Sequence, residues 1–433
     1  MSVPALVDHL FRHEAARMTA TLARILGPAR IELVEDVVQE ALLAALGRWP
    51  RDGVPANPTA WLIQVAKHRA LDALRRERLA DDRETSIREE IARWGDAEPS
   101  ARLDDAVIID DQLRMIFICC HPAIPAEARV TLTLKLAGGF GAREIARAFL
   151  AEETAIHQRL VRAKRRIREA GLALEMPDRT QLPERLESVL EVLYAMFTEG
   201  HTAHSGDALL RRDICDEAMR LGALLLRHPP TARPDLHALM ALFHLQAARF
   251  ETRSDSEGQL LLLADQDRSR WDRAHMGAGL RHLERSAAGD DMTRYHIEAE
   301  LAACHTLSPS WEETDWQRIV ELYDRLVNVV QSPIVALNRA IAVAEVAGPA
   351  AGLAALEELN GQSVLRRYPP YDAAIGEMLR RLGRYQEAMA HFTRAAERAG
   401  SVPVRHFLER RLQECAKGIN GAVETGGLRP SSA

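Results

Sequence analysis

The segment "AREIARAFLAEETAIHQRLVRAKRRIRE" (residues 142–169) predicts two helices joined by a short turn. Four apolar residues recur in the second helix at spacings of four, three and four: Ile156, Leu160, Ala163 and Ile167. This spacing puts them on one narrow face, and the arginines of the same helix lie away from it. Two helices joined in this way, the second one basic, are typical of a helix-turn-helix that binds DNA.

The charges of the basic stretch do not by themselves decide what it contacts. A solvated helix face is the commonest case, and a helix at a membrane surface is another, although the narrow apolar face lacks Trp and Phe. The preceding helix and turn favour nucleic acid. In a helix-turn-helix the start of the second helix enters the major groove and later arginines reach phosphates. We therefore expect DNA contacts from Thr154, His157, Gln158, Arg159, Arg162, Arg165 and Arg166.

The composition predicts an all-α protein of several domains. A chain of 433 residues is too long for one ordinary domain. Aromatic residues make up only 5%, and Ala, Leu, Arg and Glu are abundant, which favours helices over sheets. No stretch is apolar enough to span a membrane, and the N-terminus lacks the pattern of a secretion signal. Five scattered cysteines fit reduced thiols, so we expect a cytoplasmic protein.

The N-terminal part predicts three further helices. Periodic apolar residues indicate helices over 5–26 and 31–46, and a loop rich in Pro and Gly follows. Asn57 and Pro58 predict the start of a third helix that runs to about Leu79, because Asn caps a helix and Pro suits its first position.

Two parts of the chain resemble one known family, in that family's order. "EDVVQEALLAAL" (35–46) and "NPTAWLIQVAKHRALDALRRERL" (57–79) resemble region 2 of the extracytoplasmic-function sigma factors of bacterial RNA polymerase, a group within the sigma-70 family. "EARVTLTLKLAGGFGAREIARAFLAEETAIHQRLVRAKRRIRE" (127–169) resembles region 4. The resemblance covers roughly residues 5–172. Because of its long helical extension, the chain resembles the subgroup of these factors that carries a C-terminal tetratricopeptide-like domain.

The resemblance implies a sigma factor, which is not an enzyme and needs no cofactor or metal. Such a protein binds core RNA polymerase through the β′ clamp helices and the β flap, and it directs the polymerase to promoter DNA. Asp36, Gln39 and Glu40 match the positions that contact the clamp helices, although a stripe of this kind is by itself usually a solvated face. Region 4 would recognise the −35 element. The cations that would hold the −10 element are Lys67, Arg69, Arg75 and Arg76.

The C-terminal half contains one segment with a clear repeat pattern. Residues 371–400 fit a tetratricopeptide unit, with Gly376 at the small position of its first helix. The packing positions of its second helix are Ala388, Phe392 and Ala395. A similar second helix is marked by Trp316, Ile319, Tyr323 and Leu326. A solenoid of such units usually binds a protein or peptide on its concave face, and the sigma regions themselves are an alternative partner.

Two alternative functions stay open at this point. One is a helix-turn-helix regulator that acts without binding polymerase. The other is an enzymatic or metal-binding module in the C-terminal half, where His201, His204, Asp207 and Cys215 invite such an interpretation. Their spacing matches no recognised metal site, so we expect none. The adjacent Cys119 and Cys120 predict a buried helix end.

The expected domain organisation follows from these patterns. It comprises region 2 over 5–80, an acidic linker over 81–109, region 4 over 110–172, a tetratricopeptide-like domain over 183–418 and a disordered tail over 419–433.

Overall fold

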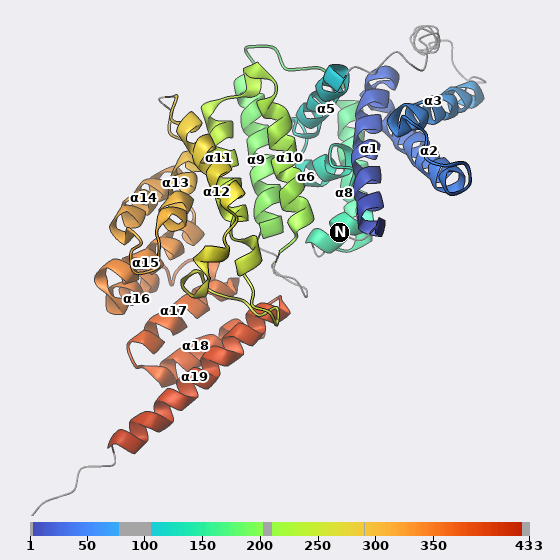
Figure 1. The fold of residues 1–433 in the computed structure, drawn as a ribbon. Helices are drawn as coiled ribbons and strands as arrows, with labels where there is room; N and C mark the ends of the chain where they lie inside the picture. The colour runs from blue at the N-terminus through green and yellow to red at the C-terminus, as the bar shows by residue number, and fades with distance from the viewer. Residues whose placement is uncertain (1–2, 78–104, 150, 202–209, 290, 427–433) are drawn as a thin grey trace, which may run out of the picture. The chain divides into compact units, whose positions relative to one another are not determined.

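The computed structural model describes residues 3–77, 105–149, 151–201, 210–289 and 291–426. Within these ranges every regular secondary-structure element is a helix, and the only β-type pairing is an isolated bridge between Ser254 and Leu260. The predicted all-α class is confirmed (Figure 1). The chain forms two compact units, one made of Met1–Thr198 with Asp216–Thr231 and the other of Glu199–Cys215 with Ala232–Ala433.

The first three long helices form where the apolar periodicity predicts them. They are α1 (Val3–Leu26), α2 (Ile31–Asp52) and α3 (Pro58–Glu77), with a short 3-10 helix, η1 (Pro28–Arg30), after α1. Asn57 caps α3 as expected, because its side-chain oxygen accepts a hydrogen bond from the Ala60 amide at 3.0 Å. α2 extends beyond its predicted end at residue 46 and stops before Gly53, whose φ of +83° suits glycine.

Four helices follow in the same unit: α5 (Asp105–Cys119), α6 (Ala126–Leu136), α7 (Ala142–Phe149) and α8 (Glu153–Glu169). The four predicted apolar positions of α8 are all at most 3% exposed, so the narrow face packs into the core against α6 and α7. Cys119 and Cys120 are fully buried at the end of α5, as predicted. Most of the expected acidic linker lies outside the described residues.

The first unit also includes most of α9 (Leu182–His201) and α10 (Arg212–Leu226). Arg185 in α9 donates a hydrogen bond to the Phe117 carbonyl at 2.7 Å, and the Ser188 hydroxyl donates to the Cys120 carbonyl at 2.8 Å. These bonds satisfy carbonyl groups at the end of α5 that have no partner within the helix. The boundary that we expected near residue 183 therefore does not separate α9 from α5.

The second unit is a series of helix pairs. Its helices are α11 (Pro234–Ala247), α12 (Arg273–Ser286), α13 (Arg294–Leu307), α14 (Trp316–Val329), α15 (Pro333–Ala347), α16 (Pro349–Glu357), α17 (Pro369–Arg381), α18 (Tyr385–Arg398) and α19 (Val402–Gly426). Consecutive helices from α13 onward pack against each other (Figure 1). α19 reaches Gly426, so the expected disorder from residue 419 is wrong over the described part of the tail.

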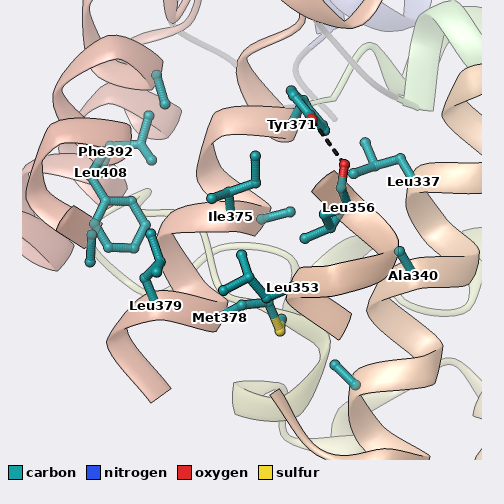
Figure 2. Close-up of a cluster of buried hydrophobic side chains, with 14 of the residues drawn as sticks. Leu337, Ala340, Leu353, Leu356, Tyr371, Ile375, Met378, Leu379, Phe392 and Leu408 are labelled. Atoms are coloured by element: carbon teal, nitrogen blue, oxygen red, sulfur yellow. Dashed lines mark hydrogen bonds between the residues drawn. The ribbon is translucent and has the colours of Figure 1, made fainter. Parts of the chain in front are cut away.

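The core of the last helices follows the repeat pattern (Figure 2). Ala388, Phe392 and Ala395 of α18 are at most 1% exposed. A Cβ atom on Gly376 would lie 2.9 Å from the Phe392 ring, so α17 and α18 approach too closely there for a side chain. The Tyr371 hydroxyl donates to the Leu356 carbonyl at 2.9 Å and links α17 to α16. The packing agrees with the predicted roles of these residues.

Candidate nucleic-acid interface

The solvent-facing side of α8 carries the residues that we expected to contact DNA. Arg159 is partly exposed, and the other six are exposed. These six are Thr154, His157, Gln158, Arg162, Arg165 and Arg166. They lie opposite the buried stripe, because a helix with one narrow apolar face has to turn its other side to solvent. The structure therefore brings all seven candidates onto one surface of one helix.

The arginines of this surface make only weak contacts within the protein. Arg162 Nε donates to the Gln158 carbonyl at 3.2 Å, and Arg165 Nε lies 3.4 Å from a Glu169 carboxylate oxygen. Arg166 Nε donates to the Ala123 carbonyl at 3.1 Å. An exposed ion pair contributes at most about 1 kcal/mol, and a guanidinium has five N–H donors. These side chains therefore keep N–H donors that no described residue occupies.

Two basic residues of α8 form ion pairs with acids of α2. Lys164 forms an ion pair with Glu35, and Lys135 of α6 lies 3.6 Å from the same carboxylate. Arg168 lies 3.1 Å from Glu32. The basic stretch therefore has two faces, one in solvent and one paired with acids of α2. The sequence did not reveal this, because the two acids precede α8 by more than a hundred residues.

The turn before α7 is held from two sides. The Gly141 amide donates to Glu144 at 2.6 Å, and Glu144 also pairs with Arg12 of α1 at 2.8 Å. Gly139 has a φ of +72°, and a Cβ atom there would lie 2.2 Å from the Arg12 carbonyl oxygen. Arg220 of α10 donates to the Ala137 carbonyl at 3.2 Å. Contacts from α1 and α10 thus fix the start of the α7–α8 pair.

The acidic positions of α2 form an exposed stripe. Asp36, Gln39 and Glu40 are all exposed, as the interpretation of a binding surface requires. Glu40 lies 3.4 Å from Arg69 of α3, and both side chains are about half exposed. This contact places one candidate polymerase-binding residue beside one candidate DNA-binding residue.

The basic positions of α3 have different environments. Arg69 is exposed, whereas Lys67 is only 6% exposed and lies beside the buried Ala66. The position of Lys67 therefore disagrees with the expected contact to DNA, because its side chain points to the packed side of the helix. Arg75 and Arg76 belong to α3, but their side chains lie outside the described residues.

The histidine-rich segment of the C-terminal half shows no metal centre in its described part. His201 and Cys215 are described, whereas His204 and Asp207 lie outside the described residues. Burial holds the pKa of His201 well below its usual value, helped by the nearby Arg253 and Arg249. No group of three or more His, Cys, Asp or Glu in the described ranges is arranged to hold a metal. Nor does any described helix have the length and apolarity of a membrane span.

Comparison with known proteins agrees with this architecture. A model of sigma-70 region 2 matches residues 10–79, which correspond to α1–α3. A model of a family of unknown function, DUF6596, matches residues 185–287, which correspond to α9–α12. No solved structure matches the chain. The chain thus contains one segment similar to sigma-70 region 2 and another similar to the DUF6596 family.

The relationship extends over nearly the whole chain. "Uncharacterized protein R00370" of Rhizobium meliloti (strain 1021) is 39% identical over 390 residues, which cover 89% of this chain and 90% of that protein. The chain belongs to the same family as this protein. An alignment over 89% of the chain includes most of both its N-terminal and its C-terminal half.

Proposed function

We propose that this protein is a sigma factor of the extracytoplasmic-function type, which binds core RNA polymerase and directs it to specific promoters. The observation that carries the proposal is the sigma-70 region 2 at residues 10–79, followed in the same compact unit by the exposed basic face of α8. A region 2 alone would leave promoter recognition incomplete. The combination supplies two surfaces for two promoter elements.

In this proposal α7 and α8 act as a helix-turn-helix that recognises the −35 element. Thr154, His157 and Gln158 lie at the exposed N-terminal part of α8, where a recognition helix contacts base edges. Arg162 and Arg165 lie one and two turns further and would contact phosphates, which set the register on the duplex. Arg69 would contribute to holding the −10 element.

The exposed stripe of Asp36, Gln39 and Glu40 would bind the β′ clamp helices of the polymerase. Its exposure and its position on one side of α2 support this role. The chain itself then performs no covalent chemistry and needs no cofactor, because the polymerase catalyses RNA synthesis. A cytoplasmic location follows from that role.

The helical extension would act in regulation. The pairwise packing of α13–α19 and the close approach of Gly376 to Phe392 support a tetratricopeptide-like solenoid. Such a solenoid offers a surface for a protein or peptide partner. A contact with the sigma regions is the alternative way for it to control their activity.

Run-off transcription tests the proposal. Full-length protein is combined with core RNA polymerase and a library of promoter DNA. We expect discrete transcripts that depend on the protein, and we expect Asp36→Arg to abolish both transcription and co-purification with the polymerase. The matched control is Glu313→Arg, because Glu313 is an exposed acid of the second unit. Sequence-specific DNA binding without any polymerase association would instead identify a regulator that acts alone.

A further inference from the structure

The connection between α11 and α12 contains three arginines that lie near one another. It folds as short 3-10 helices, among them η3 (Phe250–Thr252) and η5 (Arg268–Arg270). Burial lowers the pKa of Arg249 to about 10, and the positive charges of Arg253 and Arg268 contribute to this shift. η3 and η5 contact each other, which brings Arg249 and Arg253, on either side of η3, close to Arg268 at the start of η5. The three arginines therefore form one cluster.

No carboxylate balances this cluster among the described residues. None of the three guanidinium groups lies within ion-pair distance of an acid in the described ranges, whereas Arg318, for example, contacts both Glu300 and Glu321. The one acid whose charge raises the pKa of Arg268 is Glu312, which is exposed. Arginine does not lose its proton in proteins. Because a partly buried cation without a counter-charge is costly, other groups have to stabilise these charges.

Helix ends provide part of that stabilisation. Arg268 donates to the carbonyls of His305 and Ser308 at the end of α13, at 2.7 and 2.6 Å. Arg253 donates to the last carbonyl of α9, and Arg249 donates to the side chain of Gln246 in the last turn of α11. A helix C-terminus carries roughly half a negative charge. The two ends whose carbonyls accept from Arg253 and Arg268 leave about two positive charges uncompensated.

Several polar atoms in the same place have no hydrogen-bond partner among the residues that the structure describes. They are Arg249 Nε, Arg268 Nη2, Trp271 Nε1 and His305 Nδ1, all of them buried. The Arg268 guanidinium carbon lies 4.9 Å from the centre of the Trp271 ring. Burial, Arg249 and Arg268 together lower the pKa of His305 to about 3, so its ring is neutral at pH 7. Buried donors in folded proteins are nearly always satisfied, so this group indicates an acceptor that the described residues do not supply.

We propose that Arg249, Arg253 and Arg268, with Trp271 and His305, bind a small oxyanion: phosphate or the phosphoryl group of a small metabolite. A phosphate monoester carries about 1.5 to 2 negative charges at pH 7 and three acceptor oxygens. That charge matches the uncompensated part of the cluster, and guanidinium groups are suited to phosphate geometry. A carboxylate has one charge and two oxygens, so it matches less well. The site lies within the second unit and is independent of the proposed sigma-factor function.

Isothermal titration calorimetry on the full-length protein tests the site. Inorganic phosphate, glycerol phosphate and acetate are titrated at constant ionic strength in chloride buffer. Saturable binding of phosphate or of glycerol phosphate supports the proposal, and the tighter of the two identifies free phosphate or a phosphoryl group as the preferred form. Acetate that binds as tightly as both would overturn the choice of phosphate. No binding of either phosphate compound at millimolar concentration would overturn the site.

Variants separate a ligand site from a structural cluster. We expect Arg249→Gln to weaken phosphate binding by about tenfold or more, because a charged hydrogen bond is lost. Arg270→Gln is the control, since Arg270 is an exposed arginine of the same connection, and it should stay within about twofold of the parent. Without phosphate, Arg249→Gln should melt no lower than the parent protein, because it removes an uncompensated charge; with saturating phosphate it should melt lower. An equal loss in melting temperature in both conditions would overturn the proposal.

A second substitution covers the case in which Arg249→Gln does not fold. Arg268→Lys keeps the positive charge but loses the planar set of donors. We expect it to weaken phosphate binding by about tenfold. Unchanged phosphate affinity in this variant would contradict the role of the guanidinium group.

Discussion

The ion pair between α2 and α8 should contribute strongly to the stability of the first unit. The Glu35 carboxylate is only 11% exposed, and it contacts Lys164 and Lys135, which are 13% and 19% exposed. Glu35→Ala removes the shared partner and leaves two mostly buried ammonium groups facing each other. Removing one partner of a buried pair costs about 3–5 kcal/mol of stability. Because these three side chains are still slightly exposed, we expect Glu35→Ala to lose about 3 kcal/mol, the lower end of that range.

The assay is differential scanning calorimetry of the full-length protein, with hydrogen exchange to identify the transition that contains α2 and α8. For a unit of this size, about 3 kcal/mol corresponds to a fall of about 6–12 °C in Tm. Glu32→Ala is the matched control, because the pair of Glu32 and Arg168 is about half exposed. It should cost less than about 1 kcal/mol.

Two results would refute the stabilising role of this buried pair. One is an equal loss of stability in Glu35→Ala and Glu32→Ala, which would mean that burial adds nothing to the pair. The other concerns the double variant Glu35→Ala with Lys164→Ala, which should lose less stability than the sum of the single variants. Strict additivity would show that Glu35 and Lys164 do not interact.

Three further predictions concern other parts of the chain. Gly376→Val should destabilise the second unit by about 1–3 kcal/mol, because the new side chain meets the Phe392 ring. Gly361→Val is the control and should be nearly neutral, since no atom lies within 4 Å of its Cβ position. Thermal unfolding compares the two variants. Burial, with neighbouring imidazole and guanidinium groups, lowers the pKa of His282 to about 4, so stability should fall as the pH drops from 6.5 toward 4. His282→Gln should flatten the dependence of Tm on pH. Arg165→Ala should reduce the slope of log promoter affinity against log salt by about 0.9, and an unchanged slope would exclude a phosphate contact.

The local patterns of the sequence determined the helices and their inner faces. The spacing of the apolar residues in α8 is a property of the helix itself, so the buried stripe could be predicted without any knowledge of its partner. The same holds for the cap at Asn57 and for the packing of Phe392 against Gly376. The exposed candidates of α2 and α8 followed directly, because they occupy the other faces of the same helices.

Only the tertiary structure decided which charges meet. Lys164 and Arg168 belong to the same basic stretch as Arg165, yet they pair with acids of α2 that are far away in the sequence. Lys67 has the positive charge expected of a DNA contact, but it lies on the packed side of α3. The arginine cluster around Arg249 was not predicted, because its members come together through the ends of three helices. Periodicity describes one helix at a time, whereas electrostatic compensation depends on distances between helices, and those are set by how the helices pack.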